Sequence, residues 1–98
     1  MTKTLVRNNS AQEADVLEDS EFITVALEQI STQALALKDT TQSEDLLVGM
    51  ANILELMQEV LVKNNITPID AVQYAANLRA EFGSFCDKKY ISTEEEKE

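Results

Sequence analysis

Apolar residues recur at helical spacing in three segments of the chain. In the first segment, residues 19–38, they stand three or four positions apart, which places them on one face of a helix. Ser20 or Asp19 is expected to cap the start of this helix, and Lys38 to end it. The predicted inward residues of this segment are Phe22, Ile23, Ala26, Leu27, Ile30, Ala34 and Leu37.

The second segment, residues 42–63, is the most apolar part of the chain. Over residues 46–62, 12 of 17 residues are apolar. The polar residues Asn52, Glu55 and Glu59 share one face of the predicted helix. A helix that is apolar over most of its surface must be covered on more than one side, so we expect a second chain to cover it. The positions expected to be buried there include Leu47, Met50, Leu54, Met57 and Leu61.

Signals at the helix ends support these boundaries. Thr41 and Glu44 have the spacing of a capping box at the start of the second helix. Asn64–Asn65 are expected to end it, because asparagine tolerates the left-handed conformation. Pro68 suits the first position of a third helix, which should stop near Gly83. The expected inward residues of the third helix are Ile69, Val72, Ala75 and Ala76, with Leu78 as a further candidate.

These segments predict an all-α protein of a single domain. The expected architecture is an antiparallel bundle of two long helices and a shorter third, completed by a homodimer or a higher homo-oligomer. Residues 1–18 form an N-terminal arm, residues 19–91 the helical domain and residues 92–98 an acidic, mobile tail. With only two glycines and one proline in 98 residues, a β-sandwich or barrel would lack turn residues.

The net charge indicates which kinds of partner are unfavourable, and the cysteine content indicates the cellular compartment. The net charge is −10, with only eight lysines and arginines, which argues against binding nucleic acid or an anionic membrane. Cys86 is the single cysteine, so no internal disulfide can form and a reducing, cytoplasmic location is expected. No apolar run is long enough to span a membrane.

Few residues offer catalytic chemistry. The chain has no histidine, the commonest general base, and Cys86 has no second cysteine to partner it. Neither glycine lies in a phosphate-binding loop. The remaining route to hydrolysis is a set of helix carboxylates that bind Mg²⁺.

The order of several short motifs resembles that in the short MazG-like nucleoside-triphosphate pyrophosphohydrolases. This family is also similar to the phosphoribosyl-ATP pyrophosphohydrolases. The resemblance covers nearly the whole chain. It rests on Thr4-Leu5-Val6-Arg7-Asn8-Asn9, Asp19-Ser20-Glu21-Phe22, the connection Lys63-Asn64-Asn65-Ile66-Thr67, and Phe82-Gly83-Ser84-Phe85 followed by Lys88-Lys89-Tyr90-Ile91.

The resemblance implies where a metal site would lie. In that family, Glu-Glu-x-x-Glu on the first long helix and Glu-x-x-Asp on the second hold Mg²⁺, which bridges the phosphates of the substrate. The matching positions here are all uncharged, and they are Thr32, Gln33, Ala36, Gly49 and Asn52. Because Mg²⁺ prefers charged oxygen, we predict no metal, no cofactor and no catalytic residue at this place. Arg7 is retained and is the candidate ligand for a phosphate of the substrate.

Three hypotheses follow for the function. The first is a catalytically silent relative of the pyrophosphohydrolases, kept as a helical oligomer with a binding or regulatory role and with a nucleotide as a candidate ligand. The second is an active Mg²⁺-dependent pyrophosphohydrolase with a rearranged site that uses Glu28, Glu55 and Glu59. The third is an acidic protein that binds a basic protein partner. We favour the first, and therefore expect that the protein is not an enzyme.

Overall fold

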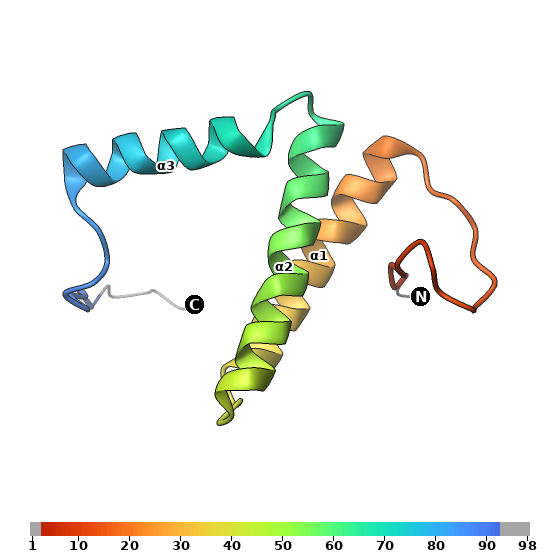
Figure 1. Cartoon of the computed structure of the whole chain (residues 1–98), viewed down its shortest axis with the longest axis horizontal. Helices are drawn as coiled ribbons and strands as arrows, with labels where there is room; N and C mark the ends of the chain where they lie inside the picture. The colour runs from red at the N-terminus through yellow and green to blue at the C-terminus, as the bar shows by residue number, and fades with distance from the viewer. Residues whose placement is uncertain (1–2, 93–98) are drawn as a thin grey trace. The chain divides into compact units, whose positions relative to one another are not determined.

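The computed structural model describes residues 3–92, and within that range it contains three helices and no strand (Figure 1). They are α1 (Asp19–Leu37), α2 (Ser43–Lys63) and α3 (Pro68–Phe82). The prediction of an all-helical protein is confirmed, and each helix begins and ends close to its expected position. Of the predicted acidic tail, residues 93–98 lie outside the described part of the chain.

The chain divides into two compact units. The first ends at Pro68 and the second begins at Ile69. The first unit contains the arm, α1 and α2, and the second contains nearly all of α3 and the segment after it.

In the first unit, α1 and α2 lie side by side (Figure 1). Near the start of α2, Gly49 contacts Leu37 from the end of α1 so closely that an added Cβ would lie 2.5 Å from Leu37 Cδ2. At the other end of the pair, the Lys63 ammonium lies 5.5 Å from the centre of the Phe22 ring, within the range of a cation–π contact. Because glycine has no Cβ, α1 and α2 can approach closely at Gly49.

Few side chains of this helix pair are deeply buried. Among the described residues, the buried apolar side chains are Val25, Ala26 and Ile53. The predicted inward face of α1 was partly wrong, because Leu27 and Ala34 are exposed whereas Val25 is buried. The apolar residues of α1 are spread over more than one row of the helix, and α2 covers only the row that contains Ala26.

The end of α2 follows the prediction. Asn65 has a φ of 62°, in the left-handed region expected for asparagine. The Ile66 N–H donates to the Leu61 carbonyl at 2.9 Å and the Asn65 N–H to the Val62 carbonyl at 3.0 Å. This pair of bonds is the Schellman motif, which satisfies carbonyls that the helix itself leaves free.

The helix starts differ from the prediction. α1 begins at Asp19 after Glu18, and α2 begins at Ser43 after Gln42, with no side-chain capping bond at either start. The predicted caps were therefore wrong: Asp19 already belongs to its helix, and Thr41 lies one residue before the cap position. In place of a side-chain cap, acidic residues in the first turn of each helix interact favourably with the positive end of the helix dipole. They are Asp19, Glu21, Glu44 and Asp45.

The second unit leaves α3 without a buried side chain. The predicted inward face of α3 is contradicted within the described residues, since Ile69, Val72, Ala75 and Leu78 are exposed and Ala76 is only half-buried. The physical reason is that this unit contains no other helix to cover that face. Gly83 follows α3 with a φ of 89°, which explains why the helix ends there.

The α2 positions expected to contact another chain are accessible in the single chain. Leu47, Met50, Leu54 and Met57 are exposed, and Leu61 is half-buried. Although α2 is rich in apolar residues, none of the helices in the described part of the chain has both the length and the hydropathy needed to cross a membrane.

Candidate functional site

The N-terminal arm contacts α1 through alternate residues. Lys3 Nζ pairs with Glu21 Oε2 at 2.8 Å, and the Leu5 backbone N–H donates to Gln29 Oε1 at 2.8 Å. Contacts at every second residue are typical of an extended segment. The hydrogen bond that Lys3 donates to Glu21, and then the negative charge of Glu21, raise the pKa of Lys3 above its ordinary value of 10.5. The arm is therefore attached to α1 at two points.

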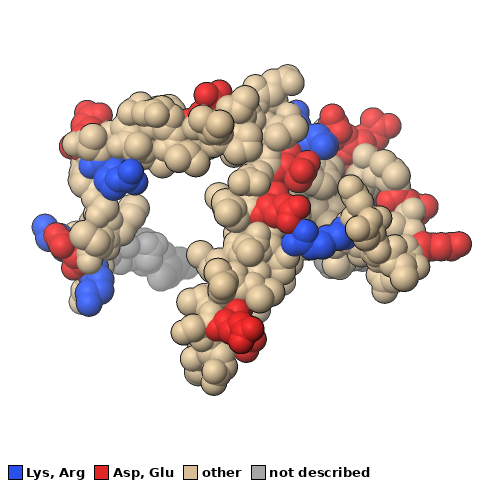
Figure 2. All heavy atoms as spheres, viewed as in Figure 1, with Lys and Arg blue, Asp and Glu red and all other residues tan. Residues whose placement is uncertain are grey.

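Arg7, the candidate phosphate ligand, is the next alternate residue and contacts α2. Its Nη1 donates to Glu55 Oε1 at 2.6 Å, and its Nη2 donates to Asn52 Oδ1. The planar guanidinium suits two neighbouring acceptors. The side chains of Arg7 and Glu55 remain 63% and 56% exposed, so the ion pair contributes at most about 1 kcal/mol. In Figure 2, basic and acidic side chains meet beside α2, whereas much of its length carries neither.

Three of the positions that the resemblance assigns to metal ligands have structural roles. Thr32 Oγ1 donates to the Glu28 carbonyl within its own helix at 3.1 Å. Gly49 accommodates a leucine side chain of α1, and Asn52 accepts a hydrogen bond from Arg7. Gly49 and Asn52 therefore take part in the contacts of α2 with α1 and with the arm, whereas the bond of Thr32 is internal to α1.

The remaining two positions are Gln33 and Ala36. Ala36 is exposed and has no polar group. Gln33 is half-buried, and its Oε1 is buried without a hydrogen-bond partner. A buried oxygen of this kind costs about 1–3 kcal/mol if it stays unsatisfied. It supplies one neutral oxygen, which is a poor basis for binding Mg²⁺.

The structure does not bring together Glu28, Glu55 and Glu59, the carboxylates of the rearranged-site hypothesis. Within residues 3–92, no three acidic, cysteine or histidine side chains form a group that could hold a metal ion. Glu55 pairs with Arg7, and Glu59 accepts from Lys63 at 3.5 Å. Two of the three carboxylates therefore already have basic partners.

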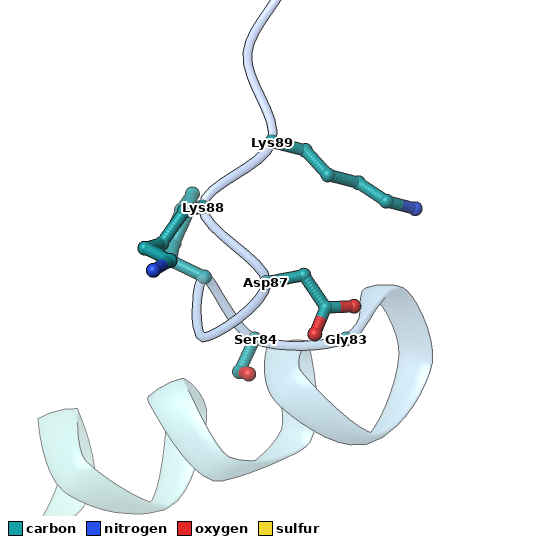
Figure 3. Close-up of a pocket in the computed structure, with 6 residues that line it drawn as sticks. Gly83, Ser84, Asp87, Lys88 and Lys89 are labelled. Atoms are coloured by element: carbon teal, nitrogen blue, oxygen red, sulfur yellow. The ribbon is translucent and has the colours of Figure 1, made fainter.

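The turn after α3 contains the other cluster of polar residues. It encloses an open hollow of about 310 Å³ lined by Gly83, Ser84, Phe85, Asp87, Lys88 and Lys89. Ser84 Oγ accepts from the Cys86 N–H at 3.2 Å, which stabilises the turn. Figure 3 shows the side chains of Lys88 and Lys89 pointing in different directions. They do not converge on one point, so the hollow lacks the paired cations that an anion site would use.

Two contacts were not predicted from the sequence: that of Gln29 with the arm and that of Leu37 with Gly49. Gln29 shares the α2-facing row of α1 with Ala26 and Gln33, where a polar residue needs a hydrogen-bond partner. The place of Gln29 in this row was therefore the feature of the sequence that indicated a hydrogen-bond partner. The partner itself, a backbone N–H of the arm, is not visible in a helical pattern.

The geometry thus brings Arg7, Asn52 and Glu55 together and leaves Glu28 apart from them. Comparisons of the chain with models of known protein families, with curated proteins and with solved structures gave no match.

Proposed function

We propose that this chain is a catalytically silent relative of the MazG-like nucleotide pyrophosphohydrolases that acts as a helical homo-oligomer with a binding or regulatory role. A reducing, cytoplasmic location belongs to the same proposal. The relationship itself rests on the order of the sequence motifs.

One observation supports the proposal most directly. Arg7 spans Asn52 and Glu55, so one of the family's ligand positions and the nearest substitute carboxylate both bind a cation of the protein. A divalent metal at Glu55 would have to displace Arg7, and it would then find a neutral amide beside it. Charged oxygen ligands are what allow a protein to replace the tightly held water of Mg²⁺.

The competing hypothesis of an active enzyme requires a rearrangement. Arg7 and Lys63 would have to leave Glu55 and Glu59, and Glu28 would have to approach them. Replacing Arg7 with alanine removes the first of these obstacles. If a latent site exists, this replacement should strengthen metal binding.

The test combines turnover with metal binding. The wild-type chain and Arg7→Ala are incubated with each nucleoside triphosphate, with and without Mg²⁺ or Mn²⁺, and pyrophosphate release and the heat of metal binding are measured. We expect no metal-dependent release and no heat of binding at millimolar metal for either protein.

Release at an ordinary enzymatic rate of about 1 s⁻¹ or more would overturn the proposal, provided that Glu55→Gln abolishes it and the matched control Glu44→Gln does not. A thermal-shift screen with the same nucleotides reports the binding role, because a ligand of the native state raises its apparent stability. We expect any such shift to be independent of metal.

A further inference from the structure

The N-terminal arm lies on a defined set of acceptor groups of the helix pair. Its donors are the ammonium of Lys3, the backbone N–H of Leu5 and the guanidinium of Arg7. The side chains that accept these bonds are Glu21 and Gln29 of α1 and Asn52 and Glu55 of α2. Every donor thus belongs to the arm and every acceptor to the helices. We call the four accepting side chains the arm seat.

The arm seat makes a different demand at each of the three alternate positions. The Glu21 carboxylate binds the ammonium of Lys3 at 2.8 Å. Gln29 binds the backbone N–H of Leu5 at 2.8 Å, a group that every residue except proline supplies. The two acceptors of α2 suit the planar fork of an arginine, which the compact ammonium of a lysine does not match. The seat therefore fits an extended segment with a cation, a backbone N–H and an arginine at every second residue.

The contacts of the arm are open to solvent. The side chains of Lys3 and Glu21 are 54% and 48% exposed, and the ion pair of Arg7 is exposed to a similar degree. Leu5 is half-buried, whereas residues 8–16, which follow the last contact of the arm, are exposed throughout. Because exposed ion pairs contribute little to stability, the arm can leave its seat while the two helices stay packed.

The net charge of the protein favours basic ligands at the vacant seat. The chain has 18 acidic residues against eight basic ones, and its net charge is −10. When the arm leaves, the carboxylates of Glu21 and Glu55 lose their basic partners. A negative field of this kind draws cationic ligands to the protein and repels acidic ones. At this seat, a basic protein is therefore favoured over a second copy of the acidic chain.

The arm competes with any such ligand. It is tethered to α1 through residues 8–18, and a short flexible tether gives an effective concentration that is roughly millimolar. A ligand in solution binds only those molecules whose seat is free, and its apparent affinity falls in proportion to that fraction. The arm therefore lowers the affinity of the seat for a partner without any change in the helix pair.

We propose that the arm seat binds an extended basic segment of a partner protein, and that the arm inhibits this binding in the free chain. The segment carries a lysine or arginine, a residue other than proline and an arginine at alternate positions. The inference names a kind of partner for the binding role of the proposed function, and it rests on that role. It does not depend on the relationship with the pyrophosphohydrolases or on the absence of turnover.

Peptide titration of the full chain tests the inference. The probe is a synthetic peptide with the sequence of residues 1–9, blocked at both ends. Its binding at low salt is followed through the side-chain amide NMR signals of Gln29 and Asn52 in ¹⁵N-labelled protein. The wild-type chain is compared with the double variant Lys3→Gln/Arg7→Gln, whose arm has lost both of its cations. We expect the peptide to bind the double variant about tenfold more tightly, because its seat is free.

Three variants of the peptide separate recognition by the seat from charge attraction alone. Arg7→Lys and Leu5→Pro keep the charge but remove the arginine fork or the N–H, and each should weaken binding about fivefold or more. A peptide with serine at every position other than Lys3, Leu5 and Arg7 should bind as well as the original. Equal binding of all charged peptides would overturn the inference. Loss of binding by the serine peptide would restrict the seat to the sequence of the arm and would also contradict it.

Changes in the seat itself give the second readout. In the double variant, Glu55→Gln should weaken peptide binding about fivefold or more. The matched control Glu44→Gln removes an equal charge of α2 outside the seat and should leave binding nearly unchanged. Equal effects of these two changes, equal affinities of wild type and double variant, or no binding to the double variant would each refute the inference. Pyrophosphate release is measured in a separate assay, so failure of the peptide site and failure of the proposed function are distinguishable.

Discussion

The contact between Gly49 and Leu37 permits a quantitative test of how closely α1 and α2 approach. A methyl group added at Gly49 would lie 2.5 Å from Cδ2, 2.9 Å from Cδ1 and 3.1 Å from Cγ of Leu37, so the leucine must move. Overpacking costs about 1–3 kcal/mol, and the lower end applies because the end of a flexible side chain can shift. Replacing glycine with alanine inside a helix gains about 1 kcal/mol. We therefore expect Gly49→Ala to change the free energy of unfolding very little.

The same substitution should behave differently when Leu37 is shortened. In a Leu37→Ala background the clashing atoms are absent, so Gly49→Ala should stabilise the protein by about 1 kcal/mol. The difference between the two backgrounds is a coupling free energy of about 1 kcal/mol. Urea unfolding followed by circular dichroism measures this coupling free energy, with all four proteins at one concentration so that any association affects them equally.

Equal effects in both backgrounds, within about 0.3 kcal/mol, would show that Leu37 does not contact Gly49. A strongly destabilising Gly49→Ala that Leu37→Ala fails to relieve would also refute the reasoning, because the obstacle would then be some other group.

Two further predictions concern the arm. A double-mutant cycle of Arg7→Ala and Glu55→Gln should give a coupling of about 0.2–1 kcal/mol that falls with added salt, and an unchanged coupling at high salt would argue against an ion pair. Since the pKa of Lys3 is raised above 10.5, its contact with Glu21 stabilises the arm below pH 10.5 and is lost as the pH rises through the higher folded-state pKa. The side-chain ¹³C signals of Lys3 and of the Glu21 carboxylate should shift together in that range, and Lys3→Gln should abolish the shift at Glu21.

The helix ends were predictable because they depend on local chemistry. Asn65 adopts the left-handed conformation, Pro68 is the first residue of α3 and Gly83 follows its end. Each of these residue types has a backbone preference that suits its position. The caps failed because a shift of one residue in the start of a helix changes which side chain is at the cap position. Thr41 and Ser20 were therefore assigned to roles that they do not have.

The inward face of α1 could not be predicted from its own sequence. Its apolar residues are spread widely around the helix, and Val25 and Leu27 lie on nearly opposite sides of it. Which of the two is buried depends on the side that α2 and the arm cover. The pairing of Arg7 with Glu55 depends in the same way on the path of the arm, because the two residues are 48 positions apart in the sequence. Periodicity within one helix does not carry information about contacts between segments.

Under the proposed relationship, two of the positions that would lack a carboxylate take part in contacts between segments of this chain. In the proposed relationship, Gly49 stands where the family has a glutamate, and the space that its side chain would occupy is filled by Leu37. An aspartate in place of Asn52 would offer Arg7 a second charged acceptor and strengthen its hold. Restoring either carboxylate alone would therefore disturb the helix contact or tighten the arm before it created a metal ligand. Under the proposed relationship, a working metal site would therefore require joint changes at Leu37, Gly49, Asn52 and Arg7 and not a single substitution.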